Sequence, residues 1–164
     1  MKVTALEVHA LRCIVQLSSG SNEYPRGIND IAAAEGLSNE YVAKIMRELR
    51  QAGLVISKRG SKGGYFLARP ANTISVWNVI ESLGGNIYCS QNCVSPAQKV
   101  EVCTRKSDCG IRAMWRFANM IICEVLSSVS IMDLLATEGN VESLLTKRLL
   151  VKRLPPTASH GIEQ

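Results

Sequence analysis

Four of the six cysteines of this 164-residue chain lie close together, in the spacing Cys89-x3-Cys93-x9-Cys103-x5-Cys109. Thiolates are soft ligands, and several of them on one loop can close around zinc or an iron–sulfur cluster. Structural zinc sites favour Cys-x2-Cys pairs, which are absent here, whereas a larger inorganic core needs sulfurs that are further apart. The spacing therefore favours an iron–sulfur cluster. Zinc, or thiols that act as switches without any metal, are the alternatives.

A second group of chemically active residues is a concentration of positive charge. The chain has 19 Lys and Arg against 14 Asp and Glu, a net charge of +5. Residues 40–70 hold seven of these cations and only two of the acids, which equals the whole excess. A local basic field indicates an anionic partner, and double-stranded DNA is the first candidate. The alternative is an interaction module whose basic helix binds an acidic protein.

The basic segment begins within a predicted helix-turn-helix. Apolar spacing predicts helices over residues 4–19, 28–35 and 39–51. Gly36 opens the turn between the last two helices, and Ser38 is the expected N-cap of the third. The expected buried stripe of the third helix is Val42, Ile45, Met46 and Leu49. We expect its opposite, cationic face to enter the major groove of DNA.

A β-hairpin is predicted directly after this helix. Two short strands, residues 54–58 and 65–68, flank the turn Arg59-Gly60-Ser61-Lys62-Gly63-Gly64. A basic, glycine-rich tip after a helix-turn-helix is typical of a wing that lies along phosphates or enters a minor groove. The alternative is an ordinary hairpin with a polar turn. The residues predicted to bind DNA are Asn39, Tyr41, Lys44 and Arg47 from the helix and Arg59, Ser61 and Lys62 from the wing.

The sequence of the second half of the chain predicts a long helix whose apolar stripe is not fully buried by the first domain. Ser75 caps a predicted helix that runs to about residue 83, and the cysteine-rich residues 86–109 follow. Residues 110–128 then form a helix whose apolar stripe is too wide for the first domain to cover. A second copy of the same helix would cover it and give a twofold homodimer. The alternative is that the helix packs on its own domain. Shorter helices are predicted at residues 131–136 and 141–150.

These elements define the predicted fold class and domain organisation. The fold is expected to be mainly α with a small β-hairpin wing, a winged helix-turn-helix domain plus a long dimerisation helix. The predicted divisions are residues 1–72 for DNA binding, 73–109 for a linking helix and the cluster loop, 110–150 for dimerisation, and 151–164 for a flexible tail.

Several functional classes are disfavoured by the sequence. No apolar run approaches the roughly 20 residues that cross a bilayer, so no membrane partner is expected. Glu7, His9 and Arg12 interrupt the first apolar stretch, which is wrong for a signal peptide, so a cytoplasmic location is expected. With only two His and no glycine motif for phosphates after a strand, the chain is not expected to be an enzyme.

The whole pattern resembles the IscR/NsrR family of winged-helix regulators, also called the Rrf-two family, over roughly residues 1–135. The resemblance is carried by the opening Met1-Lys2-Val3-Thr4, by residues 31–41 and 49–55, by the wing at residues 59–67, and by Cys103-x5-Cys109 running into Ala113-Met114-Trp115. It implies a homodimeric, sequence-specific transcriptional regulator of a DNA operator. It also implies that an iron–sulfur cluster (2Fe-2S or 4Fe-4S) controls binding by sensing redox state, nitric oxide or iron status.

The resemblance also implies the cluster ligands. Cys103 and Cys109 keep the spacing of the family's sensing members, and the first ligand is Cys93 or Cys89. Arg112 stands where some members have a ligating His, and a guanidinium is not a ligand. The fourth ligand is therefore the remaining cysteine or, as other members use, a residue of the partner subunit's first helix. The candidates in that helix are Glu7 and His9.

Overall fold

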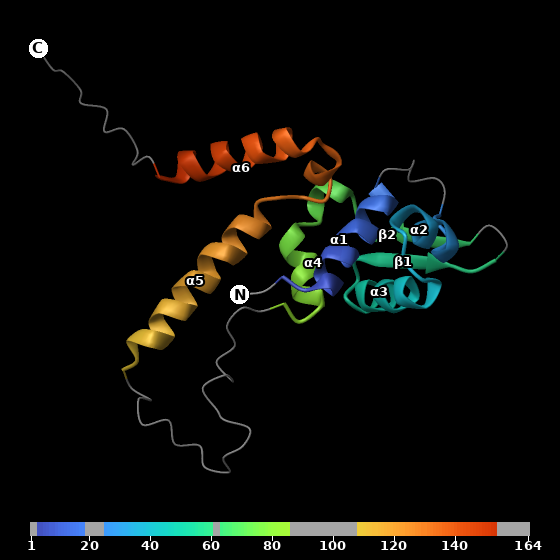
Figure 1. Ribbon diagram of the computed structural model, residues 1–164, viewed down its shortest axis with the longest axis horizontal. Helices are drawn as coiled ribbons and strands as arrows, with labels where there is room; N and C mark the ends of the chain where they lie inside the picture. Colours follow the sequence, from blue (N-terminus) through green and yellow to red (C-terminus); the bar gives the residue numbers. More distant parts are fainter. Residues whose placement is uncertain (1–2, 19–24, 61–62, 86–107, 154–164) are drawn as a thin grey trace, which may run out of the picture.

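The computed structural model describes residues 3–18, 25–60, 63–85 and 108–153. It confirms the predicted fold class, because the chain is mainly helical with one two-stranded antiparallel hairpin (Figure 1). The elements are α1 (Ala5–Ser18), α2 (Ile28–Glu35), α3 (Asn39–Gln51), β1 (Val55–Lys58), β2 (Gly64–Leu67), η1 (Ala71–Thr73), α4 (Val76–Ser82), α5 (Gly110–Ser127), η3 (Asp133–Leu135) and α6 (Glu138–Arg153). No helix among these residues combines the length and apolarity needed to cross a membrane.

The bounds of α2 and α3 match the predicted ones because local signals set them. Gly36 adopts φ 67°, a left-handed conformation that favours glycine, and ends α2. The Ser38 hydroxyl then accepts a hydrogen bond from the backbone N–H of Tyr41 at 3.2 Å, which caps the start of α3. Gly53, with φ 69°, turns the chain out of α3 toward β1. The helix-turn-helix is thus fixed by residues within its own sequence.

One hydrophobic core joins α1, α2, α3, the start of β1, α4 and η3. The stripe predicted for α3 is fully buried there, and it meets Ala10, Cys13, Ile14 and Leu17 of α1. Cys13 and Cys123 each stand alone in an apolar helical pattern, which predicts small core residues, and Cys13 is indeed 0% exposed. Cys123 received the same prediction, but it is only half-buried on α5. The prediction for Cys123 was wrong because α5 lies at the edge of this core rather than within it.

The wing is anchored near its loop by a third short segment of backbone. Arg26 and Tyr65 exchange two backbone hydrogen bonds, of 3.1 and 2.9 Å, so residue 26 pairs with the outer side of β2. Gly64 is required at this point, since a Cβ atom would lie 2.6 Å from the carbonyl oxygen of Arg26. Gly63 is equally confined, because a Cβ atom there would clash with the Lys58 carbonyl oxygen. The paired glycines therefore serve the backbone packing of the wing.

The Glu35 carboxylate ties α1 to the end of α2. Arg12 Nε and Gln16 Nε2 donate to its two oxygens, each at 2.5 Å. Gln16 Oε1 in turn accepts a hydrogen bond from Arg26 Nη1 at 2.6 Å. This bond links the network to the residue that pairs with β2 of the wing. The helix-turn-helix and the wing are therefore held as one body by polar as well as apolar contacts.

The second half of the chain is attached through a backbone strap. Val76 N–H donates to the carbonyl of Val129, and Ile131 N–H donates to that of Ile74, both at 2.8 Å. From this strap α5 and α6 diverge away from the body, as Figure 1 shows. The predicted helix at residues 131–136 is a single 3-10 turn, η3, and α6 is longer than the predicted residues 141–150.

Candidate nucleic-acid interface and cysteine site

The outer face of α3 is a cationic surface that the described part of the chain leaves exposed. Asn39, Lys44 and Arg47 are exposed on it, as predicted for residues that contact DNA. The opposite face of the helix is fully buried, so α3 is held rigidly while it presents this surface. A helix with a short polar residue at its start and cations along one side suits the major groove.

Tyr41 is placed differently from the other predicted residues of α3. Its side chain is half-buried and packs against the core. Its hydroxyl oxygen lies 3.4 Å from Nδ1 of His9 on α1. Tyr41 therefore faces the inside of the DNA-binding unit, whereas Asn39 and Lys44 face outward.

Two further charged residues belong to this surface and were not among the predicted DNA contacts. Arg50 is exposed at the end of α3, and its Nη1 donates to the Ser57 hydroxyl of β1 at 3.3 Å, which aligns helix and wing. Glu40 is exposed in the first turn, where hydrogen bonds from its own backbone and then with Ser38 lower its pKa. Both positions lie on the outward stripe that the 3.6-residue period defines, which is the signal that finds them.

The wing brings more positive charge beside α3. Arg59 is exposed directly after β1, and so is Lys58 at the end of that strand. Ser61 and Lys62, the two remaining predicted contacts, lie outside the described residues. The described part of the wing thus continues the cationic surface of α3.

Cys109 is the predicted cluster ligand that the structure describes. It occupies the N-cap position of α5, makes no side-chain capping bond there, and is a half-buried free thiol. A soft donor that is not engaged by the helix fits an iron–sulfur cluster or zinc. Cys89, Cys93 and Cys103 lie outside the described residues. Within the described ranges no three metal-binding side chains come together.

The two alternative ligands on α1 occupy different environments. Glu7 Oε2 accepts hydrogen bonds from the backbone N–H and the hydroxyl of Thr4, at 2.7 and 2.9 Å. Its other oxygen lies beside Gly85, where an added Cβ atom would be 2.6 Å away. Glu7 is therefore close to the residue that precedes the cysteine segment. His9 is turned toward Tyr41 instead.

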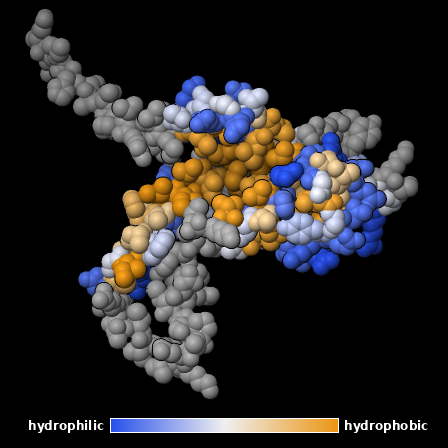
Figure 2. Space-filling view, viewed as in Figure 1, coloured by the Kyte–Doolittle hydropathy of each residue, from blue (hydrophilic) through white to orange (hydrophobic). Residues whose placement is uncertain are grey.

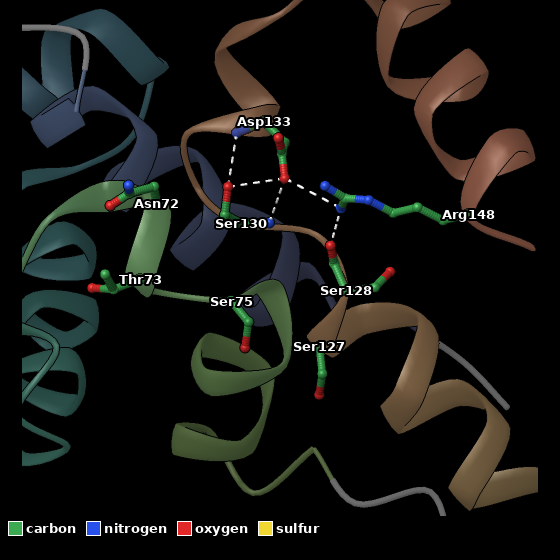
Figure 3. Close-up of a pocket in the computed structure, with 8 residues that line it drawn as sticks. All are labelled: Asn72, Thr73, Ser75, Ser127, Ser128, Ser130, Asp133 and Arg148. Carbon is green, nitrogen blue, oxygen red and sulfur yellow. Dashed lines mark hydrogen bonds and ion pairs between the residues drawn. The ribbon is translucent and has the colours of Figure 1, made fainter. Parts of the chain in front are cut away.

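A polar pocket of about 350 Å³ lies where η1, the end of α5 and α6 meet (Figure 3). Arg148 reaches from α6 to the Ser128 carbonyl oxygen and to Asp133 Oδ2. The same Asp133 oxygen accepts from the backbone N–H and the hydroxyl of Ser130. The charged groups of the pocket, Arg148 and Asp133, are thus bonded to each other and to neighbouring backbone. The pocket therefore acts as a joint between α5 and α6. Of the residues that line it, only Ser75 and Ser130 have a signal in the sequence, as predicted helix caps.

The apolar face of α5 is open to solvent in one chain. None of its side chains is buried. The large apolar side chains of α5 that are 41–61% exposed are Ile111, Met114, Trp115, Phe117, Met120 and Ile121. Figure 2 shows a broad apolar surface between α5 and α6. The apolar stripe predicted from the sequence is therefore present. The described residues of the same chain half-bury Ile122, Val125 and Leu126 but leave Met114 and Ile121 exposed, so they cover the stripe only in part.

A helix-turn-helix with a closed core, a wing with paired glycines and a helix with an exposed cationic face together define a winged-helix DNA-binding protein. The family model of Rrf2, described as iron-dependent transcriptional regulator, matches residues 4–137. The chain belongs to this family of transcriptional regulators, which are not enzymes.

Relatives of known name agree with this assignment. Protein rrf2 of Nitratidesulfovibrio vulgaris (strain Hildenborough) is 30% identical over 138 residues, which cover 82% of this chain and 87% of that protein. The HTH-type transcriptional regulator IscR of Xenorhabdus nematophila is 30% identical over 138 residues, covering 84% of this chain and 81% of the regulator.

Solved structures show the same fold. CymR, described as the global cysteine regulator of B. subtilis, superposes with a TM-score of 0.63 at 29% identity, covering 82% of this chain and 95% of CymR. IscR of T. potens superposes with a TM-score of 0.61 at 28% identity, covering 82% of this chain and 86% of that one. Similarity thus extends both to a regulator named for cysteine and to IscR.

Proposed function

We propose that this regulator is a homodimer that binds double-stranded operator DNA through α3 and the wing, with binding controlled by an iron–sulfur cluster on the cysteine segment. The observation that carries the DNA-binding part is the exposed cationic face of α3 opposite a fully buried stripe. Asn39, Lys44 and Arg47 would contact base edges and phosphates, and Arg59, Ser61 and Lys62 would follow the backbone from the wing. Because its ligand is chromosomal DNA, we place the protein in the cytoplasm.

The dimer is supported by the open apolar face of α5. Exposed apolar surface of this extent is uncommon on a monomer and marks an interaction site. A second copy presents the same face, so a twofold axis would let each α5 cover the other. Two copies would also present two α3 helices to successive half-sites on one face of the duplex.

The cluster is supported by the thiol donors and by where they attach. Cys109 begins α5, the helix proposed to hold the dimer, so a tie at this thiol would constrain the arm that relates the two α3 helices. A bound cluster would supply redox and nitric oxide chemistry at these thiolates. Cys103 and Cys93 or Cys89 would complete the set, with Glu7 or His9 of the partner subunit as the alternative fourth ligand.

A cluster-free regulator is the second candidate. The similarity to CymR, described as a global cysteine regulator, favours this candidate. The same cysteines could act as oxidisable thiols or hold zinc. In that case the signal would act on Cys93, Cys103 and Cys109 directly.

Iron and sulfide analysis separates the two candidates. We expect anaerobically purified protein to be brown and to carry iron and inorganic sulfide, and Cys103→Ala and Cys109→Ala to bleach it. Cys123→Ala is the matched control, since Cys123 lies on α5 outside the cysteine segment. Protein that is colourless and iron-free under argon would exclude the cluster and leave the thiol or zinc candidate.

DNA binding is tested with a duplex enriched from a random pool by the wild-type protein. Lys44→Ala should weaken binding to this duplex, whereas Lys62→Ala should mainly reduce the salt dependence of binding. Equal losses for both variants on random DNA would contradict this division between helix and wing. Failure of the wild type to enrich any sequence would favour an interaction module with an acidic protein partner.

A further inference from the structure

One polar contact crosses the interface between α1 and α3. His9 Nδ1 and the Tyr41 hydroxyl oxygen are 3.4 Å apart, and the two rings meet edge to face with centroids 5.6 Å apart at 90°. Edge-to-face geometry at this separation is favourable for two aromatic rings. Among the described side chains no other hydrogen bond joins α1 to α3, and the buried residues of both helices are apolar.

The contact falls at the part of α3 that would enter the groove. Tyr41 lies in the first turn, where its backbone N–H donates to the Ser38 cap. Asn39 precedes it by two positions and Lys44 follows it by three. In helix-turn-helix proteins the N-terminal residues of the reading helix contact base edges. Apolar packing is non-directional, so a directional contact at this turn is suited to fix its pose.

We propose that the His9–Tyr41 pair is a positioning contact that sets the pose of the first turn of α3 for sequence-specific binding. Tyr41 acts through this contact, not by touching a base. The inference rests on the proposed reading role of α3 and revises the role that the sequence predicts for Tyr41. It also gives His9 a role other than cluster ligation.

The location of α1 gives the pair a wider consequence. α1 packs against α3, α4 and η3. The strap from Ile74 and Val76 to the end of α5 starts from those same elements. A shift of α1 therefore reaches the first turn of α3 through His9 and Tyr41, and the pair lies between the reading surface and the proposed dimer arm.

A double-mutant cycle on the full-length protein tests the proposal. His9→Phe and Tyr41→Phe each keep a ring but remove a polar atom of the pair. Affinity is measured on a duplex enriched by the wild type and on a scrambled duplex of equal composition. We expect each single variant to lower affinity for the enriched duplex by about three- to tenfold, the range of one hydrogen bond. Affinity for the scrambled duplex should stay unchanged, and the double variant should be no worse than either single one.

The opposite pattern identifies direct reading. If Tyr41→Phe causes the same further loss when His9 is already Phe, the effects are additive and Tyr41 touches DNA on its own. If neither single variant changes the ratio of the two affinities, the contact has no positioning role. Ser82→Ala is the control, because it removes a hydroxyl that hydrogen-bonds within α4, outside α3 and the wing.

A measurement without DNA separates this inference from the proposed function. In the free protein, His9→Phe should shift the backbone amide resonances of residues 39–44 while urea unfolding confirms that the fold is intact. Unchanged resonances in the first turn would overturn the positioning role, whatever the protein binds. Failure of the wild type to enrich a duplex would instead overturn the proposed function.

Discussion

The helix-turn-helix unit and the α5–α6 arm satisfy the same hydrophobic requirement in different ways. From α1 to α4 the apolar stripes of all helices meet in one core, where Ile14, Ile45 and Leu49 are fully buried. In α5 an equally apolar stripe remains open, and none of its 18 residues is buried. The first region therefore completes its core within one chain, whereas the described residues leave part of the apolar surface of α5 exposed, and the proposed partner subunit would cover it.

The two regions also differ in the rigidity that their proposed roles need. A reading surface must be rigid to discriminate sequences, and the fully buried stripe of α3 provides that rigidity. In the proposed homodimer, the α5–α6 arm would relate two such surfaces and would have to change its arrangement when a signal acts on it. Its few internal contacts make such a change less costly.

The largest expected effect is a difference in the free energy of unfolding between the same substitution made in the core and on α5. Ile45→Ala should lower the free energy of unfolding by about 2–5 kcal/mol, because it leaves a cavity in a closed core. Ile121→Ala removes the same atoms from a side chain that is 43% exposed, and should change stability of the isolated subunit by less than about 1 kcal/mol. Urea unfolding at low protein concentration measures both. Similar losses for the two variants would contradict the comparison.

The next effect concerns the completion of the arm by a second copy. Phe117→Glu should raise the dimer dissociation constant by at least about a hundredfold, because it places a charge in an apolar interface. Sedimentation equilibrium measures this constant, and Lys147→Glu, an exposed substitution on α6, is the control. A Phe117→Glu protein that stays dimeric would show that another surface joins the subunits.

The cysteines of the two regions should differ in reactivity. Burial, followed by the nearby Glu35 carboxylate, raises the pKa of Cys13 to about 11, and the side chain is 0% exposed. In metal-stripped protein at pH 8, iodoacetamide should modify Cys13 at least about a hundredfold more slowly than Cys109, since the thiolate is the nucleophile. Peptide mass spectrometry over time measures both rates. Rapid labelling of Cys13 in folded protein would show that the core opens more readily than its packing implies.

The smallest effect concerns the joint of the arm. Hydrogen bonding from Ser130, with the charge of Arg148, lowers the pKa of Asp133. Its stabilising contribution is therefore complete above the unfolded pKa of about 3.8 and is lost as the pH falls through the lowered folded value. Asp133→Asn should reduce the free energy of unfolding by about 1 kcal/mol at pH 7. It should also make stability fall less steeply as the pH is lowered. Thermal unfolding between pH 3 and 7 measures both effects. If the loss of stability at acid pH is the same in the variant, that loss comes from other groups.

Much of the DNA-binding unit could be predicted because its signals are local. Gly36, Ser38 and Gly53 act on neighbouring backbone, so the bounds of α3 follow from the sequence. The buried stripe of α3 follows from its period. The extent of α6 could not be predicted, because apolar and polar residues are spread around that helix and no stripe marks its ends.

The orientation of single side chains was the least predictable property. Tyr41 falls near the outward face of α3 by sequence position, yet its hydroxyl meets His9, which is 32 residues away. Cys123 has the same apolar surroundings in sequence as Cys13 but lies on a helix outside the core. The joint at Arg148 brings together residues from three elements. None of these contacts has a local signal.

The sequence by itself determined the helix-turn-helix, the wing, the cationic face and the apolar stripe of α5, because capping, turn chemistry and periodicity act over a few residues. Only the tertiary structure decided which faces close on one another: it buried Cys13, turned Tyr41 inward and left α5 open. The physical reason is that burial depends on what packs against a face, and the packing partners are distant in the chain.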